Sequence, residues 1–511
     1  MHTIRFKLKV TKSDACEIDR RFRSLCHIHN VLVKHAIKLL KKLERDPEYS
    51  ALKQEYCEIL SKSQQTTSDE KQRKELSRDM DRIRKDIGLT EYGLQSYIKV
   101  CGKQFRKQVS SQQVQKEAQR VWKGVEKVLF GNGKKLRYKK PDEMMTIGGK
   151  SNLNGAKFDK KKRSVSWLGL HLACKAPRRE KDIAYMKESL STDISYCEIA
   201  RKMFAGGWHY YVIVYLKGPA PRKERKVGKG VTGIDMGTSI MAAVSDETAV
   251  LQELAPESNK YNHKIEKLLR QMDISRRNSN PEKYNEDGTI NRKNHEQWNR
   301  TKGYDRKFRQ LKTLYRKKAA YIKQSHLETI YQLLKVSNEF ITENMDYKAL
   351  QKRGKHTERS EKGSKVTVKN KKGSNKPVYK EIRKYKRKKR FGKSLNDRAP
   401  GMFLELLERR SEIYGGQVHY VDTWKYKASQ YDHVKDMYIK APLNQREKEV
   451  GGRKVQRDLY SAYLLKNADE EYKQPDRKKC VESYKRFLKL QDQEIERMKE
   501  QGISKKYCYG F

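Results

Sequence analysis

The sequence lacks the features that mark several protein classes. None of its eight cysteines forms a C-x-x-C pair, which favours a reduced set of thiols over a disulfide framework or a zinc ribbon. No apolar run is long enough to span a membrane. Residues 1–12 alternate apolar and basic side chains, which predicts a strand and leaves no hydrophobic core of a signal peptide. We therefore expect a cytoplasmic protein.

Acidic residues are scarce relative to basic ones. The 511 residues include 117 Lys and Arg against 64 Asp and Glu, a net charge of +53. Such a charge repels itself, so we expect a polyanionic partner, for which nucleic acid is the obvious candidate. Only 36% of residues are hydrophobic, but 30 Tyr, 12 Phe and 5 Trp exceed what a disordered basic tail usually carries. We expect a folded protein whose order depends partly on its partner.

The chain is long enough for two to four domains. Residues 13–130 predict helices because apolar residues recur three or four positions apart, whereas 131–226 predict short strands that form a small β-barrel with 1–12. A third region begins near residue 227 with strands and a long charged helical stretch. Residues 351–393 carry 19 Lys or Arg against 3 Glu, which predicts either a mobile insertion or a segment lying along a phosphate backbone.

Three carboxylates lie at the edges of predicted elements, more than a hundred residues apart from one to the next. Asp235 is in a strand, Glu343 is in a later strand, and Asp458 begins a helix. Each acid considered alone also has a structural explanation. Asp235 could be a buried structural acid, Glu343 could be a surface residue of its strand, and Asp458 could be an acid that stabilises the first turn of its helix. Taken together, strand acid, strand acid and helix acid is the order in which an RNase H-like fold clusters carboxylates around two Mg²⁺ ions.

The segments around these acids resemble the three RuvC motifs of the transposon-encoded TnpB nucleases and of their descendants, the compact type V CRISPR effectors. "GIDMGTS" (233–239) resembles the first motif, "FITENM" (340–345) the second and "QRDLYSAYLL" (456–465) the third, which "VHYVDTWKYKASQ" (418–430) precedes. The order of parts agrees over most of the chain. The resemblance implies an RNA-guided endonuclease that cuts double-stranded DNA beside a short flanking motif.

The resemblance also implies a domain plan and a catalytic set. The implied fold is multidomain α+β, with a helical recognition lobe, a wedge β-barrel and a RuvC α/β nuclease domain that is split in sequence. The implied ranges are the wedge at 1–12 and 131–226, the helical lobe at 13–130, the nuclease domain at 227–427 and 452–475, a target-strand-loading loop at 428–451, and a C-terminal tail at 476–511. Asp235, Glu343 and Asp458 would be the catalytic ligands of two Mg²⁺ ions.

The partners implied by the resemblance are a guide RNA, of transposon or CRISPR type, and target double-stranded DNA. No membrane partner is expected. A chain of this length could hold a guide–target heteroduplex alone, so we expect one protein copy per guide. The implied setting is the cytoplasm of a prokaryote, with action at the nucleoid.

Two departures from the family pattern affect the third motif. The family usually carries a zinc ribbon of two cysteine pairs before this motif, but residues 429–457 contain no cysteine, and His433 cannot hold a metal by itself. We therefore expect no zinc. Tyr460 and Ser461 replace the usual Asn and Ala, while Asp458 is retained. We expect the chemistry to survive with altered positioning.

A glutamine pair in the helical region resembles the part of the family that approaches the flanking DNA motif. Gln112 and Gln115 could read base edges because Gln pairs with adenine through two hydrogen bonds. The alternative, that both are ordinary exposed residues of a helix, is favoured.

Two other functions fit the same pattern. One is an RNA-guided DNA-binding repressor that has lost cleavage, and the other is a structural RNA-binding protein that uses the RuvC-like fold as a scaffold. A nuclease-inactive derivative is expected to have lost at least one acid, and all three are present. This favours an active nuclease.

Overall fold

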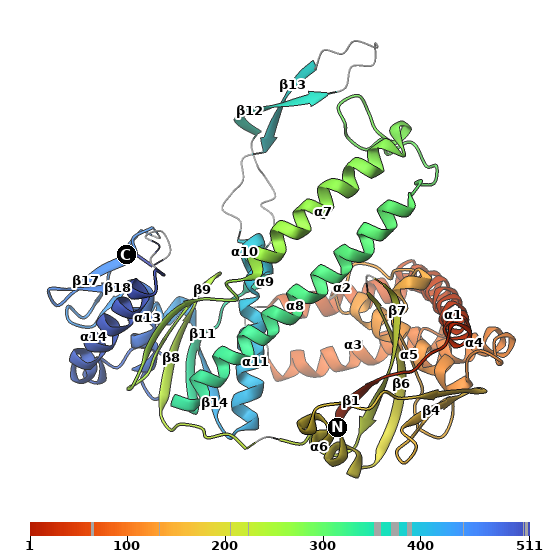
Figure 1. Cartoon of the computed structure of the whole chain (residues 1–511), viewed down its shortest axis with the longest axis horizontal. Coiled ribbons are helices and arrows are strands. Elements are labelled where there is room, and N and C mark those ends of the chain that lie inside the picture. Colours follow the sequence, from red (N-terminus) through yellow and green to blue (C-terminus); the bar gives the residue numbers. More distant parts are fainter. Residues whose placement is uncertain are drawn as a thin grey trace. The chain divides into compact units, whose positions relative to one another are not determined.

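The computed structural model contains two compact units, Met1–Lys223 and Glu224–Phe511 (Figure 1). It describes the chain apart from residues 63–65, 132, 205, 223, 352–358, 369–377, 386–390, 443, 504 and 506–508. For strands β12 (Arg359–Val368) and β13 (Val378–Tyr385) it describes the backbone alone, so the interpretation of the basic segment 351–393 falls mostly outside the described residues. No helix in the described part of the chain has the length and apolar content needed to cross a membrane.

The helices of the first unit follow the strand β1 (His2–Lys7). They are α1 (Lys12–Glu44), α2 (Pro47–Ser61), α3 (Thr67–Asp86), α4 (Glu91–Gln104) and α5 (Ser111–Leu129). Capping boxes begin α1, α3 and α5, where a Ser or Thr hydroxyl accepts a hydrogen bond from the third helical N–H. Helix α5 packs against α1 and α4, and its apolar face is buried with theirs in one core.

The strands of the first unit form two open sheets. One has the order β1, β7 (Gly207–Leu216), β6 (Ile194–Phe204) and β2 (Thr146–Gly148), and all its pairs are antiparallel. The other contains β3 (Ala156–Asp159), β4 (Ser164–Trp167) and β5 (Leu170–Ala173), and the helix α6 (Glu180–Ser191) follows it in the chain.

The predicted closed β-barrel is therefore wrong, although the N-terminal strand does join the larger sheet. Strand β1 pairs with β7 over its full length, but at the opposite edge β2 has three residues against the eleven of β6. A barrel requires the two edge strands to pair with each other. With the described strands split between a four-stranded and a three-stranded sheet, neither sheet closes.

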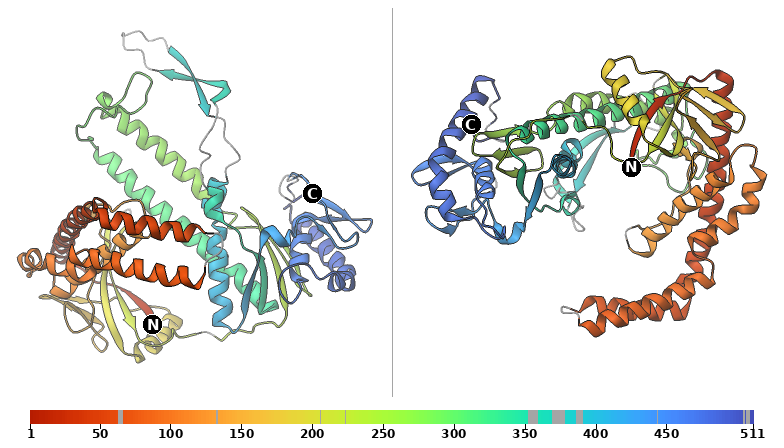
Figure 2. Two further views of the ribbon diagram at one scale, coloured as in Figure 1. Left: turned by 180° about the vertical axis from the view of Figure 1, so that it is seen from behind. Right: turned by 90° about the horizontal axis from the view of Figure 1, so that it is seen from below.

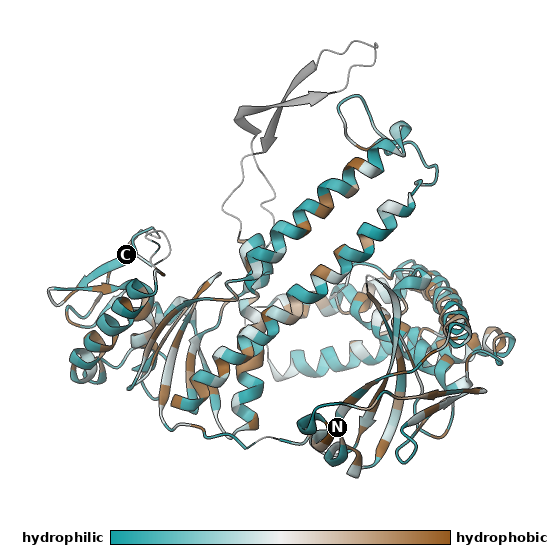
Figure 3. Cartoon of the chain, in the orientation of Figure 1, coloured by the Kyte–Doolittle hydropathy of each residue, from teal (hydrophilic) through white to brown (hydrophobic). Residues whose placement is uncertain are grey.

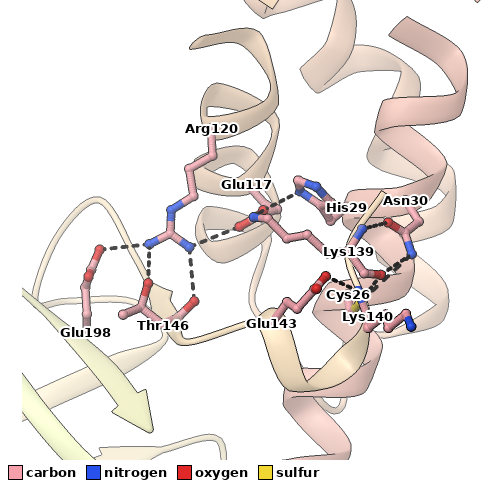
Figure 4. Close-up of polar contacts among 10 residues, drawn as sticks. All are labelled: Cys26, His29, Asn30, Glu117, Arg120, Lys139, Lys140, Glu143, Thr146 and Glu198. Atoms are coloured by element: carbon pink, nitrogen blue, oxygen red, sulfur yellow. Dashed lines mark hydrogen bonds and ion pairs between the residues drawn. The ribbon is translucent and has the colours of Figure 1, made fainter. Parts of the chain in front are cut away.

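A buried polar network fixes α5 to its neighbours (Figure 4). Glu117 of α5 is fully buried, lies 2.7 Å from His29 Nδ1 of α1 and accepts a hydrogen bond from Arg120 at 3.1 Å. Arg120 also donates to Thr146 and to Glu198 of β6. Burial acts to raise the pKa of Glu117, but the hydrogen bond to His29 and the positive charge of Arg120 together lower it. Glu117 is thus ionised at neutral pH, and its partners join α5 to α1 and to the sheet.

The central sheet of the second unit has five strands. In sheet order they are β10 (Ala249–Glu253), β9 (Ile240–Val244), β8 (Val231–Met236), β11 (Glu339–Glu343) and β14 (Gln417–Val421). The first three form an antiparallel meander, whereas β11 runs parallel to both β8 and β14. The sheet therefore changes from antiparallel to parallel pairing at β8.

Helices cover both faces of this sheet. On one face Ile234 and Met236 of β8 pack with residues of α8 (Lys302–Val336) and α11 (Pro400–Ile413). On the other face lies α13 (Arg457–Lys466), which contacts β8 and β9 directly. Because side chains alternate along a strand, Gly233 and Asp235 face α13 while Ile234 and Met236 face the other way.

A long helical hairpin joins the meander to β11. Helix α7 (Ser258–Asn278) lies beside α8, and the two views in Figure 2 show them as a pair. Both helices are mostly hydrophilic (Figure 3), and their contact is made by a small cluster that includes Ile265, Met272 and Leu311. The remaining short helices are η1 (Pro141–Glu143), η2 (Pro281–Lys283), α9 (Tyr347–Gln351), α10 (Gly392–Arg398) and α12 (Thr423–Tyr426).

Residues 476–511, expected from sequence to be a tail, contain the 24-residue helix α14 (Arg477–Glu500). Its Cys480, Phe487 and Met498 are buried with residues of α13 and β9 in one apolar cluster. Its Glu494 accepts a hydrogen bond at 2.9 Å from the backbone N–H of Leu251, on the edge strand β10. This C-terminal helix therefore belongs to the packed structure of the second unit.

Candidate functional site

The position of Asp458 relative to Asp235 depends on a glycine. Gly233 of β8 lies so close to α13 that an added Cβ atom would be 2.0 Å from the carbonyl oxygen of Ala462 and 2.3 Å from the backbone nitrogen of Lys466. Any larger side chain would force the helix away from the strand. Asp235 lies two residues after Gly233 on the same face of β8, and Asp458 lies one helical turn before Ala462, so this contact brings the two acids to the same end of the sheet.

The third acid reaches this end through strand pairing. Strand β11 runs parallel to β8, with Thr342 opposite Ile234, so Glu343 ends β11 beside Asp235. The first turn of α13 carries Asp458 and is capped by Gln456, whose side chain accepts a hydrogen bond from the N–H of Leu459 at 2.7 Å. The three acids thus lie in the elements predicted from sequence, two strands and a helix start.

The surroundings of the three acids disfavour negative charge on Asp235 and Glu343 in the metal-free protein. Burial raises the pKa of Asp235 well above its usual range, and the negative charges of Asp458 and Glu343 raise it further. Burial also raises the pKa of Glu343, to about 7. The hydroxyl of Tyr347, which donates a hydrogen bond to the Met236 carbonyl at 3.4 Å, has its pKa raised by burial and then by the charges of Asp235 and Glu343. This end of the sheet therefore favours a cation.

An arginine that was not predicted from sequence also belongs to the site. Asp235 and Asp458 line a small pocket of about 120 Å³ with Arg446 and with the turn formed by residues 237–239. The Arg446 guanidinium donates to Asp458 Oδ2 at 3.4 Å. Its positive charge also lowers the pKa of Asp235, against the larger effects that raise it. Arg446 is thus a counter-ion of Asp458, and Arg457 and Arg446 both act to lower the pKa of Asp235.

The three side chains are of the right chemical type to bind a divalent cation, but they are not close enough together to do so in this structure. Three carboxylates offer the hard oxygen ligands that Mg²⁺ prefers, and a bound cation would relieve the repulsion that raises the pKa of Asp235. In the part of the chain that the structure describes, however, no three His, Cys, Asp or Glu side chains are grouped in a way that could hold a metal ion. Side-chain rearrangement, including release of Asp458 from Arg446, would have to accompany binding.

The raised pKa of Glu343 predicts a pH dependence of stability in metal-free protein. Between its ordinary value of 4.5 and about 7, folded Glu343 keeps its proton while the unfolded chain releases it. Because the folded state binds more protons in this window, the free energy of unfolding falls as pH rises, by on the order of 1–3 kcal/mol. Thermal melts in chelator at pH 5 and 7 should show a smaller pH difference for Glu343→Gln than for the wild type. Equal differences for the two proteins would contradict the assignment.

An aromatic core supports the loop that lacks zinc ligands. The loop contains the short strands β15 (Tyr431–Asp432), β16 (Met437–Tyr438), β17 (Glu447–Val450) and β18 (Arg453–Gln456). His433 is buried, with Nδ1 at 2.7 Å from the hydroxyl of Tyr460, and it contacts the rings of Tyr463 and Tyr484. The Tyr463 ring in turn stacks on Phe487 of α14 at 4.4 Å.

This core contains Tyr460, one of the two residues by which the third motif departs from the family pattern. Tyr460 is only 1% exposed and fills space between the loop and α13, while its hydroxyl also accepts a hydrogen bond from the His433 backbone N–H at 3.3 Å. The hydroxyl of Ser461 donates to the Arg457 carbonyl at 3.0 Å and stays within the helix. Tyr460 thus joins the loop to α13 by packing and hydrogen bonds.

The two glutamines belong to the first unit, on helix α5. The side-chain oxygen of Gln112 accepts hydrogen bonds from the backbone N–H of Lys150 at 3.3 Å and from the hydroxyl of Ser151 at 3.2 Å. A bidentate pair with adenine needs that oxygen as well as the amide N–H. Gln115 is half-buried, and no side-chain hydrogen bond joins it to another residue in the described part of the chain.

Comparison with known proteins gives limited likenesses. No protein-family model matches the chain, and no curated protein matches it. Among solved structures it is similar to the cryo-EM structure of a Cas12f1–sgRNA–target DNA complex, with 11% identity over 87% of this chain and 82% of that chain and a TM-score of 0.42. It is also similar to the cryo-EM structure of a CRISPR-Cas12f ternary complex, with 12% identity over 89% and 82% and a TM-score of 0.25.

Proposed function

We propose that the chain is an RNA-guided DNA endonuclease that cuts double-stranded DNA with a single RuvC-type site. The observation that carries this proposal is the placement of Asp235, Glu343 and Asp458 at one end of the sheet, from three separate elements. There burial, and then the charges of the other two acids, raise the pKa of Asp235. Structural acids are seldom placed so that they repel one another. Strongly perturbed carboxylates beside a pocket are typical of catalytic sites.

In this proposal the three acids are the ligands of two Mg²⁺ ions. When bound, the ions would supply an activated water and stabilise the leaving oxygen of the phosphodiester. The chain's own contribution is the rigid strand–helix contact at Gly233, which holds Asp235 and Asp458 at one end of the sheet. Arg446 at the same pocket supplies a positive charge for the phosphate.

The proposed partners are a guide RNA and target double-stranded DNA, with one protein copy per guide. Two observations support these partners. The first is the net charge of +53, which two nucleic acids would neutralise. The second is the resemblance of the sequence motifs to those of TnpB nucleases and compact type V effectors. No zinc is proposed, because the aromatic core around His433 and Tyr460 already joins the loop to α13.

The decisive experiment uses the purified protein with the RNA that copurifies with it. The RNA is sequenced, which distinguishes a transposon-type guide from a CRISPR-type guide, and a matched plasmid is incubated with the complex and Mg²⁺. Cleavage that depends on both the match and the metal supports the proposal. Sequence-matched binding without cleavage would instead indicate a nuclease-inactive repressor, and RNA binding without DNA recognition would indicate a structural RNA-binding protein.

Arg446→Gln should slow cleavage by about 10²-fold, the usual cost of removing one group that stabilises transition-state charge. Affinity for RNA and for target DNA should change little, because one charge in 117 basic residues is lost. The measurement is single-turnover cleavage of a matched plasmid. The matched control is Arg453→Gln, which removes a nearby exposed arginine that pairs with Asp492. If both variants cut at the same rate, Arg446 has no role in the reaction.

A further inference from the structure

The first unit contains a pocket of about 570 Å³ that the proposed cleavage site does not use. It forms where the residues after β1 meet the start of β7 and the residue that follows Cys174. The residues that give it its character are Lys7, Lys9, Lys12, Lys175, Trp208 and Tyr210. Its volume falls in the range of small-molecule and nucleotide sites, about 300–1,000 Å³.

Backbone hydrogen bonds hold the lining in place. The N–H of Leu8 donates to the Tyr210 carbonyl at 2.9 Å, and the N–H of Lys9 donates to the Ala173 carbonyl at 2.8 Å. The N–H of Lys175 donates to the Lys7 carbonyl at 2.7 Å. Three of the lysines therefore extend from paired backbone, so their Cα positions are fixed before any ligand arrives.

The four lysines have no acidic partner among the described residues. The three acids nearest in sequence to Lys12 are already engaged. Asp14 accepts hydrogen bonds from the N–H and hydroxyl of Thr11 at 3.0 and 2.8 Å, Glu17 pairs with Arg21 at 3.0 Å, and Asp19 pairs with Arg201 at 2.8 Å. Four ammonium groups around one pocket repel each other, and an anion bound there would remove that repulsion.

The aromatic wall gives the pocket a second preference. Trp208 is half-buried, and the guanidinium of Arg201 lies 4.4 Å from its ring centroid, which fixes the ring. Tyr210 beside it is buried. Lysines around an aromatic wall suit a ligand that carries both a phosphate and a flat ring.

We infer that this pocket binds one nucleotide of a single-stranded nucleic acid, with the phosphate on the lysines and the base against Trp208. The inference goes beyond the proposed cleavage function, because every residue involved lies in the first unit and none is a carboxylate of the candidate site. RNA and DNA strands share this chemistry, so both are included in the test.

The experiment is photo-crosslinking of the full-length, nuclease-treated protein to a short single strand that contains 5-iodouracil, in an RNA arm and a DNA arm. Mass spectrometry then identifies the crosslinked peptide. The expected crosslink is in the peptide that carries Trp208, in at least one arm, and the stronger arm identifies the natural source. The double variant Lys9→Gln with Lys12→Gln should lower the crosslink yield on the order of tenfold. The strand is kept below saturation at about 0.1 M salt, where each lost phosphate contact weakens binding, since one such contact contributes about 0.7 to the slope of log affinity against log salt concentration.

The matched control is Lys161→Gln with Lys162→Gln, which removes the same charge from an exposed turn of the same unit. Its crosslink yield should equal that of the wild type. No crosslink to the Trp208 peptide in either arm, or equal losses in the two double variants, would overturn the inference. Asp235→Asn should crosslink like the wild type, so a failure of the cleavage proposal would not be mistaken for a failure of this one.

Discussion

Asp235→Asn should abolish plasmid cleavage, by about 10³-fold or more, while RNA and target DNA still bind as they do to the wild type. The factor corresponds to loss of the several kcal/mol of charge stabilisation that a correctly held metal supplies. Binding is preserved because the side chain is small, lies at the end of β8 and has no described hydrogen-bond partner to lose. Single-turnover cleavage and filter binding on the same preparations provide the two measurements.

The same variant should also be more stable than the wild type in chelator. Asn cannot ionise, so it avoids the cost that burial and the charges of Asp458 and Glu343 impose on an acid at this position. The metal-free melting temperature at neutral pH should therefore rise, and the stabilisation by added Mg²⁺ should shrink. Asp246→Asn is the control, since Asp246 is an exposed acid of the same unit that pairs with Lys466 at 2.6 Å. Should Asp235→Asn or Asp235→Ala instead be misfolded, or cut normally, Asp235 is a structural acid.

Tyr460→Ala should lower the free energy of unfolding by about 3–5 kcal/mol, the usual cost of removing a buried aromatic ring. The ring is 1% exposed and packs against His433, Tyr463 and Phe487. Because Tyr460 lies two residues after Asp458, cleavage should fall as well. Thermal or denaturant unfolding, followed by a cleavage assay, measures both effects.

Tyr460→Phe separates packing from hydrogen bonding. It keeps the ring but leaves the buried His433 ring nitrogen and backbone N–H without the hydroxyl, at a cost of about 1–3 kcal/mol. A zinc chelator should leave the melting temperature of the wild type unchanged. If the chelator destabilises the protein, or if Tyr460→Ala melts like the wild type, a metal rather than the aromatic core holds the loop.

The elements that carry the acids were predictable because their sequence signals are local. An apolar run that ends in "GIDMG" and a helical pattern after Asp458 each identify an element without reference to the rest of the chain. The barrel was wrongly predicted because closure depends on which edge strands meet, and strand lengths such as the three residues of β2 cannot be read from alternation. Pairing partners are set by tertiary structure.

Other parts of the site have no distinctive sequence signal. Arg446 is one of 117 basic residues, and only the fold shows that its guanidinium reaches Asp458. The missing cysteines lead us to expect that no zinc is bound, but they give no sign of the aromatic core, because its rings come from the loop, α13 and α14. Residues 476–511 are predicted as a tail, but they contain α14, whose buried residues include polar Gln491 and Glu494.

The contact between Gly233 and α13 has a consequence for how this chain can vary. Asp235 and Asp458 are more than two hundred residues apart in sequence, yet their relation in space is set by the packing of α13 on β8, with a very close approach at Gly233. The segments between them can therefore change in length without moving the acids, provided that β8 and α13 keep their contact. The loop at the tip of α7 and α8 is thus a natural place to insert a foreign domain, whereas a single methyl group at position 233 would be harder to tolerate than many added residues there.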